Sequence, residues 1–176
     1  MIIPSAELPF NDETWLVSDT HFFHANIGQY CSRPDGWQDL ILDNWNHHIQ
    51  PGDSVFHLGD LALGKKENLE ALAPLLNGNL YLMRGNHDRR SSAFYQNLGI
   101  KLVKDPYRLE HGSGMRLVFS HRPIVPLLPG MLNLHGHIHN NPTLALGPRY
   151  INLSIEVRQY RPWKLGDVLR LYMDYW

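Results

Sequence analysis

Short apolar runs alternate with amphipathic stretches along the first half of the chain. Residues 15–18, 54–58 and 80–83 form three apolar runs with the length and composition of strands. Between them, residues 37–49 carry apolar side chains near helical spacing, and residues 65–76 also predict a helix. Turn-forming pairs of residues follow both helices. The pattern predicts a β-α-β-α-β unit, in which parallel strands bring their functional loops together at the carboxyl edge of the sheet.

The second half of the chain has strand-like segments and few predicted helices. The segments cover residues 100–104, 107–110, 116–119 and 150–157. Gly112-Ser113-Gly114 lies between the second and third segments, which predicts a hairpin. We therefore expect a second sheet, packed face to face with the first, and the helices of the first half outside. This arrangement would bury the alternating Leu, Ile and Val side chains.

Length, charge and cysteine content indicate an intracellular enzyme of modest size. A chain of 176 residues predicts one domain over residues 1–176. Its formal charge of -1, from 16 basic and 17 acidic residues, lacks the basic footprint of a strong nucleic-acid binder. The single Cys31 excludes an internal disulfide and fits a reducing compartment. No apolar run approaches the roughly 20 residues of a membrane span, and Met1–Phe10 has no positive side chain of a secretory signal. We expect a cytoplasmic location and no membrane partner.

Five short motifs rich in metal ligands are scattered between residues 19 and 139. They are Asp19-Thr20-His21, Gly59-Asp60, Gly85-Asn86-His87-Asp88, Ser120-His121 and Gly136-His137-Ile138-His139. Each motif alone is weak evidence for a metal site, but several follow predicted strands, and their order indicates one two-metal site. Aspartate oxygens, an asparagine carbonyl and neutral imidazoles are ligands that divalent first-row metals accept, and the motifs contain no thiolate. This donor set is typical of hydrolysis.

The motifs, in this order, resemble those of the calcineurin-like metallophosphoesterase superfamily. The opening Asp-Thr-His-x-x-His-x-Asn-Ile of residues 19–27 and the Ser-His-Arg-Pro of residues 120–123 are similar to a group of small bacterial and phage phosphoesterases. The resemblance implies a four-layer αββα sandwich, two mixed sheets flanked by helices, with the metals at the strand ends. It also implies the ligands: Asp19, His21 and His139 for one metal, Asn86, His121 and His137 for the other, and Asp60 as the bridge.

The chemistry of such a site predicts phosphoester hydrolysis. Two cations would lower the pKa of a hydroxide held between them, which would attack phosphorus in line. The same cations would offset the charge that develops on the phosphate oxygens. The resemblance implies that His87, beside the ligand Asn86, donates a proton to the leaving oxygen as general acid. Manganese is the first choice of metal because the ligands are oxygen-rich, with iron, zinc and nickel as alternatives.

Four residues near the motifs are candidates for functional roles, and three of them have a second interpretation. Asp88 orients a histidine as part of the catalytic machinery, or it caps the helix that follows. His24 and Asn26 contact the substrate phosphate, or Asn26 caps a short helix. Arg122 binds phosphate in a bidentate fashion, or it forms a salt bridge at its loop.

Three further arginines, Arg33, Arg89 and Arg90, form a rim that attracts an anionic substrate, or they are ordinary solvated surface.

Departures from better-known branches of the superfamily narrow the substrate. Asp60 is followed by Leu61-Ala62-Leu63-Gly64, whereas Ser/Thr protein phosphatases have Val-Asp-Arg-Gly at this place. The capping region of double-strand-break repair nucleases does not follow the motifs, so duplex DNA is not expected. We predict a phosphodiesterase for a small or nucleotide-type substrate, working as a monomer or homodimer. The alternatives are a phosphomonoesterase, a nuclease on nucleic-acid ends, and a binding module of the same fold without turnover. The complete set of ligands disfavours the last.

Overall fold

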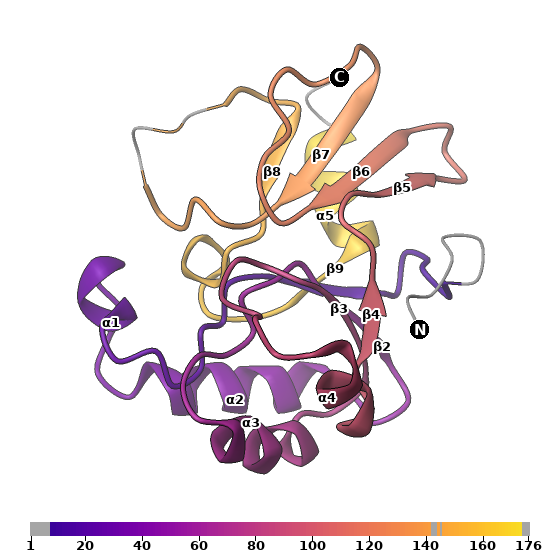
Figure 1. Cartoon of the computed structure of the whole chain (residues 1–176). Helices are drawn as coiled ribbons and strands as arrows, with labels where there is room; N and C mark the ends of the chain where they lie inside the picture. The colour runs from indigo at the N-terminus through magenta and orange to yellow at the C-terminus, as the bar shows by residue number, and fades with distance from the viewer. Residues whose placement is uncertain (1–7, 142–143, 145, 174–176) are drawn as a thin grey trace.

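Strands from both ends of the chain form the first sheet (Figure 1), in a computed structural model that describes residues 8–141, 144 and 146–173. Its parallel strands are β1 (Trp15–Val17), β2 (Ser54–His57), β3 (Asn79–Met83) and β4 (Lys101–Val103). A short strand, β9 (Trp163–Lys164), pairs antiparallel with β1. The order across the sheet is β4-β3-β2-β1-β9, so the predicted β-α-β-α-β unit is confirmed.

The second sheet is also mixed and has the order β5-β6-β7-β8. Its strands are β5 (Tyr107–Glu110), β6 (Arg116–Ser120), β7 (Met131–His135) and β8 (Tyr150–Asn152). The predicted hairpin joins β5 to β6, which pair antiparallel, whereas β6, β7 and β8 are parallel. The carboxyl ends of β6, β7 and β8 therefore lie at one edge, as those of β1, β2 and β3 do in the first sheet.

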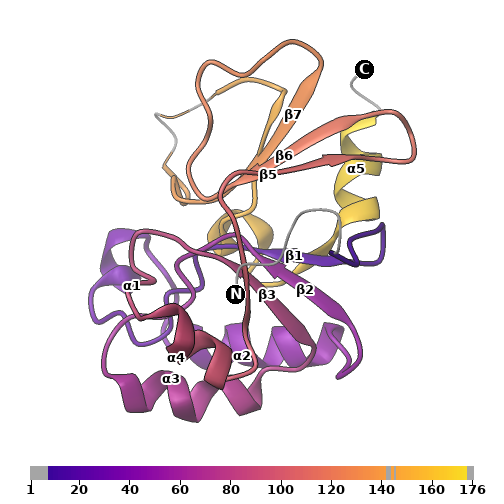
Figure 2. The same ribbon diagram turned by 45° about the vertical axis from the view of Figure 1, so that its right-hand side comes forward.

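Three helices cover the outer face of the first sheet, and the second sheet lies on its other side (Figures 1 and 2). They are α2 (Trp37–His48), α3 (Lys66–Leu72) and α4 (Ser92–Asn97). Trp45 of α2 is fully buried against the sheet, and its indole Nε1 donates to Asn77 O at 2.9 Å. A short helix, α1 (Ile27–Tyr30), projects from the loop after β1. No helix among the described residues is long and apolar enough to cross a membrane.

Aromatic side chains fill the space between the two sheets. Phe56 and Tyr81 of the first sheet pack with Tyr107 and Phe119 of the second, and burying each contributes roughly 1.5–3 kcal/mol. The last helix, α5 (Leu165–Met173), adds its buried side chains to this cluster. Ser18 and Ser154 form a parallel bridge between the sheets. The sheet edges formed by the carboxyl ends of the parallel strands consequently meet.

Some elements differ from the sequence prediction. The strand expected over residues 150–157 ends at Asn152, and a 3-10 helix, η3 (Ile155–Arg158), follows. The strand β7 was not predicted because Asn133 interrupts its apolar pattern. Within the core the Asn133 amide donates to Val118 O at 3.0 Å and to Ser120 Oγ at 2.9 Å, and its carbonyl accepts from the Ile124 N–H at 2.9 Å. A polar side chain that satisfies its hydrogen bonds can therefore occupy a central strand.

Candidate metal centre

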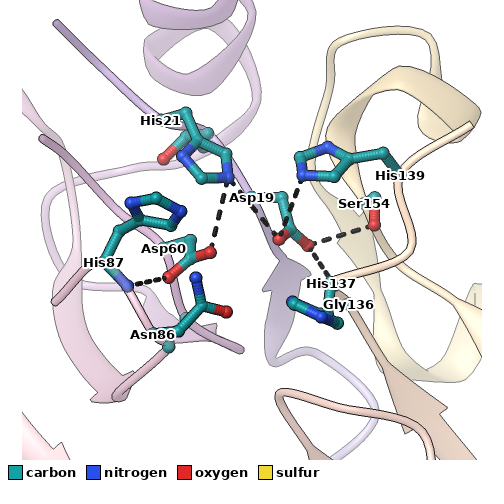
Figure 3. A network of polar contacts seen from close by, with 12 residues as sticks. Asp19, His21, Asp60, Asn86, His87, Gly136, His137, His139 and Ser154 are labelled. Atoms are coloured by element: carbon teal, nitrogen blue, oxygen red, sulfur yellow. Dashed lines mark hydrogen bonds and ion pairs between the residues drawn. The ribbon is translucent and has the colours of Figure 1, made fainter. Parts of the chain in front are cut away.

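The predicted metal ligands follow the carboxyl ends of strands from both sheets and converge on one cluster (Figure 3). Loops after β1, β2 and β3 contribute from the first sheet, and loops after β6 and β7 contribute from the second. Parallel strands place their carboxyl ends at one edge, where ligand-binding loops of open sheets usually gather. All seven predicted ligands belong to this cluster: Asp19, His21, Asp60, Asn86, His121, His137 and His139.

The cluster consists of two adjacent groups. Ligand atoms of Asp19, His21 and His139 lie within 4.8 Å of one another, and so do those of Asp60, His121 and His137.

One carboxylate oxygen lies between the two groups. Asp60 Oδ2 is 3.5 Å from His21 Nε2 and 3.4 Å from His121 Nε2. Asn86 Oδ1 joins the second group at 3.0 Å from His121 Nε2. The geometry therefore gives two neighbouring sets of donors with Asp60 in the bridging position.

Three buried polar atoms of the first group have no hydrogen-bond partner among the described residues. They are Asp19 Oδ1 and both ring nitrogens of His21. Asp19 is 0 % exposed and His21 is 1 % exposed. An unsatisfied buried polar group costs about 1–3 kcal/mol and needs an explanation. A divalent cation bound by Asp19 Oδ1 and His21 Nε2 would supply one, so the side chains present fit a metal centre.

Five of the seven candidate ligands have a left-handed backbone. The φ angles are 58° at Asp19, 52° at His21, 58° at Asp60, 69° at His137 and 50° at His139. This conformation costs a residue other than glycine of order 1–3 kcal/mol and persists only where the surroundings enforce it. Here the loops enforce it on one another, because the Asp19 N–H donates to Gly59 O at 3.0 Å and the His21 N–H donates to Asp60 O at 2.9 Å. Such strain is typical of functional sites.

Two glycines of the motifs permit the close approach of these loops. A Cβ atom on Gly85 would lie 2.1 Å from Asp60 Oδ1, and one on Gly136 would lie 2.2 Å from Asp19 Oδ2. Neither position has room for a side chain.

Hydrogen bonds fix which atom of each carboxylate faces the cluster (Figure 3). Asp19 Oδ2 accepts from the His137 N–H at 2.9 Å and from Ser154 Oγ at 3.0 Å, which leaves Oδ1 for a metal. Asp60 Oδ1 accepts from the His87 N–H at 2.7 Å, which leaves Oδ2. The His121 ring is oriented in the same way, because its Nδ1 donates to a backbone carbonyl at 2.9 Å and leaves Nε2 for the cluster.

A buried ion pair supports the first group, and its acidic member belongs to none of the five motifs. Glu156 Oε1 lies 3.0 Å from His139 Nδ1 and accepts from Arg33 Nε at 2.9 Å. Arg33 also donates to the backbone carbonyls of Thr20 and Asp19, each at 2.7 Å. The expectation that Arg33 lies on a surface rim is wrong, since the residue is 7 % exposed. Glu156 lies outside every motif, on η3, and only the fold brings it to His139.

The charges of this ion pair are mutually stabilised. Burial alone would raise the pKa of Glu156, but the hydrogen bond with His139 and the charge of Arg33 outweigh burial and hold the pKa below its usual range. Burial would lower the pKa of His139, and its contacts with Cys31, Glu156 and Asp19 instead raise it. A carboxylate that holds the Nδ1–H of a histidine presents Nε2 to a metal and raises its basicity.

Asp88 has a role different from both interpretations offered above. Its Oδ2 accepts from the N–H groups of Asp60 at 2.6 Å and Gly85 at 2.9 Å, and its Oδ1 accepts from the Leu61 N–H at 3.1 Å. The helix α4 is capped instead by Ser91. Burial raises the pKa of Asp88 to about 6, although the three N–H donors act in the opposite direction. Asp88 thus holds the loop that presents Asp60 and does not touch a histidine ring through any of these hydrogen bonds.

A cleft of about 700 Å³ opens above the two groups and is lined by His24 and His87 as well as by ligands. The His87 ring lies 5.1 Å from that of His21 and 5.5 Å from that of His24, centre to centre. Arg122 is at the edge of the site, with Nη2 donating to Asn86 Oδ1 at 3.4 Å. His24 and His87 therefore line the cleft, whereas Arg122 lies beside it through its contact with Asn86.

Asn26, in contrast, is not among the residues that line the cleft. It occupies the N-cap position of α1, but its side chain makes no capping hydrogen bond there. The amide instead donates to Tyr30 Oη at 3.5 Å, and the Asn26 N–H donates to His24 Nδ1 at 3.2 Å. Asn26 therefore acts on His24 through its backbone, and neither predicted role of its side chain is supported.

A family model and several known proteins match this chain. The family model described as calcineurin-like phosphoesterase matches residues 13–170. The uncharacterized protein MJ1445 of Methanocaldococcus jannaschii is 33% identical over 171 residues, which cover 89% of each chain. The crystal structure of AQ665 from Aquifex aeolicus, a protein of unknown function, superposes with a TM-score of 0.71 and 25% identity over 92% of this chain and 100% of that chain. Pseudomonas putida nuclease MPE gives a TM-score of 0.47 and 24% identity over 73% of this chain and 62% of its own.

Proposed function

The chain belongs to the calcineurin-like phosphoesterase family and is thus a metal-dependent phosphoesterase, and on this premise we propose that it hydrolyses phosphodiesters of a small or nucleotide-type substrate. The observation that carries the proposal is the position of Asp60 Oδ2 between two groups of donors, 3.5 Å from one histidine and 3.4 Å from another. Two divalent cations held there, manganese in the first instance, would activate water and neutralise phosphate charge.

His87 is proposed as the general acid for the leaving oxygen. Its backbone N–H is held by Asp60 Oδ1, so the residue is fixed relative to the bridging carboxylate. Its half-buried ring lines the cleft beside the first group of ligands. Proton donation contributes roughly 10²–10⁴ in rate, and most of it when the leaving group is a poor one such as a sugar hydroxyl.

His24 is proposed to donate a hydrogen bond to a phosphate oxygen. Its Nδ1 accepts the Asn26 N–H at 3.2 Å, so the neutral ring carries its proton on Nε2. Burial and the neighbouring His87 lower the pKa of His24, which favours that neutral form. Arg122, beside Asn86, is a second candidate for a phosphate oxygen, because a guanidinium matches phosphate geometry.

A nucleotide-type substrate is supported by the rim of the cleft. Tyr30 of α1 lines the cleft and is 71 % exposed, more than any other large hydrophobic residue described as exposed. A base stacked on an aromatic ring contributes about 1–3 kcal/mol, and it needs a ring that is open to solvent.

The test uses metal-stripped protein with Mn, Fe, Zn, Ni or Mg added back. We expect metal-dependent hydrolysis of bis(p-nitrophenyl) phosphate that exceeds hydrolysis of p-nitrophenyl phosphate and is lost in Asp60→Ala. The control is His47→Ala, an exposed histidine of α2. Preference for the monoester would replace the diesterase by a phosphatase. Metal binding without turnover on either compound would favour a binding module.

The acid is tested separately by changing the leaving group. Nitrophenolate leaves without protonation, whereas a nucleoside alkoxide does not. His87→Ala should therefore slow hydrolysis of a dinucleotide by about 10²–10⁴-fold and that of the nitrophenyl diester far less. Equal losses on the two substrates would remove His87 from the role of acid.

A further inference from the structure

A second, smaller pocket also has His87 in its lining. Its volume is about 220 Å³, and its lining includes Lys65, Arg89 and Arg90. His87 lines both this pocket and the metal cleft, so the two spaces meet at this residue.

The lining of this pocket is positively charged. Among the residues that the structure describes, none of its three cations takes part in an ion pair, and its lining contains no carboxylate. The next residue, Lys66, differs in this respect, because its Nζ lies 3.0 Å from Glu70. The whole chain has a formal charge of only -1, so the excess is a local property of this pocket.

The guanidinium groups are held in place by backbone carbonyls. Arg90 Nη2 donates to Gly64 O at 2.6 Å, and Arg89 Nε donates to Asn86 O at 2.9 Å. A further arginine, Arg84, donates to Arg90 O, and its guanidinium lies 5.3 Å from the ring centre of Tyr95. Each guanidinium has five N–H donors. Arg89 and Arg90 therefore keep donors for a ligand while their position is already set, which lowers the entropic cost of binding.

We propose that this pocket binds a second phosphate, carried by the leaving group of the diester. The inference rests on the function proposed above, because His87 as proton donor marks the side on which the leaving group lies. A guanidinium pair with a lysine is suited to a phosphate, which arginine binds in a bidentate fashion. The favoured substrate is then a diester whose leaving nucleoside bears another phosphate, as it does in a nucleotide strand or in a small bisphosphorylated nucleotide.

The test compares two dinucleotides that differ only in a terminal phosphate on the leaving nucleoside. We expect wild-type protein to have a kcat/KM about 10–100-fold higher for the phosphorylated compound, mainly through KM, as for one or two hydrogen bonds to a charged group. In Lys65→Ala/Arg90→Ala this ratio should fall towards one. The matched control, Lys101→Ala/Arg170→Ala, removes the same charge at the start of β4 and on α5 and should keep the wild-type ratio.

A trinucleotide distinguishes the two sources of the phosphate. If its internal phosphate gives the same advantage, the substrate is a strand, and if only the terminal phosphate does, it is a small nucleotide. A wild-type ratio of one, or an unchanged ratio in Lys65→Ala/Arg90→Ala, would overturn the inference while leaving the diesterase intact.

If no diester is hydrolysed, the result counts against the proposed function and not against the pocket. The pocket can still be tested by binding. Fluorescence anisotropy in EDTA would then measure binding of the labelled, terminally phosphorylated dinucleotide. The inference requires weaker binding to Lys65→Ala/Arg90→Ala than to the control, and equal binding to both would refute it.

Discussion

Replacing Glu156 by glutamine should weaken metal binding at the group formed by Asp19, His21 and His139. The Glu156 carboxylate, 3.0 Å from His139 Nδ1, holds this ring so that Nε2 faces the site. An amide oxygen can still accept the N–H of His139, but it carries no charge and polarises the ring less. Loss of such a partner typically costs 10–100-fold in metal affinity, or about 1.4–2.7 kcal/mol.

The choice of glutamine matters because Arg33 also depends on Glu156. Both side chains are buried, 0 % and 2 % exposed, and their N–O distance is 2.5 Å. Removing one partner of a buried pair strands the other charge at a cost of about 3–5 kcal/mol. Glu156→Gln also removes the negative charge, but it keeps the shape and an acceptor for Arg33, so it is expected to lose less stability than Glu156→Ala and is the variant to assay.

The assay is equilibrium dialysis of metal-stripped protein against Mn²⁺, with bound metal counted by mass spectrometry. Wild type should bind two ions per chain, and Glu156→Gln should bind one of them 10–100-fold more weakly. Glu110→Gln, at the exposed end of β5, serves as the control, and thermal unfolding without metal checks that all three proteins are folded. Two ions bound by Glu156→Gln with wild-type affinity would show that the carboxylate does not position His139.

Gly85→Ala should lower metal-dependent activity at least about 10²-fold, because the added Cβ would lie 2.1 Å from Asp60 Oδ1 and would displace that carboxylate. Gly112→Ala, whose added Cβ would meet open space, should have unchanged activity in the same hydrolysis assay. Asp88→Asn should lower the free energy of unfolding by about 1–3 kcal/mol in a urea titration, since an amide oxygen cannot accept three N–H groups. The lowered pKa of Glu156 means that its contribution to stability is complete above its ordinary pKa of 4.5 and is lost as the pH falls below it. Metal-free wild type should therefore lose stability more steeply below that pH than Glu156→Gln, and parallel curves would contradict this.

The sequence predicted the parts of the site that are encoded locally. Asp60 and its neighbours lie in short motifs after apolar strands, so their order indicated one two-metal site, and the resemblance to a known superfamily divided the ligands between the two metals. Glu156 could not be found in this way, because its partner Arg33 is 123 residues away and neither belongs to a motif. The strand β7 was missed for the same reason, because the hydrogen bonds that make Asn133 acceptable there come from other parts of the second sheet.

The backbone of the candidate ligands also leads us to expect that metal binding and folding are linked in this protein. Left-handed residues such as Asp19 and His139 are strained, and the unpaired atoms of Asp19 and His21 add a desolvation cost. Cross-loop hydrogen bonds, the carboxylate of Asp88 and the ion pair of Glu156 hold the loops in place against this strain. Cations bound at the site would pair with Asp19 Oδ1 and His21 Nε2, and they would stabilise the folded state by mass action because the unfolded chain has no such site. The residues that pre-organise the loops therefore affect metal affinity without touching the metal.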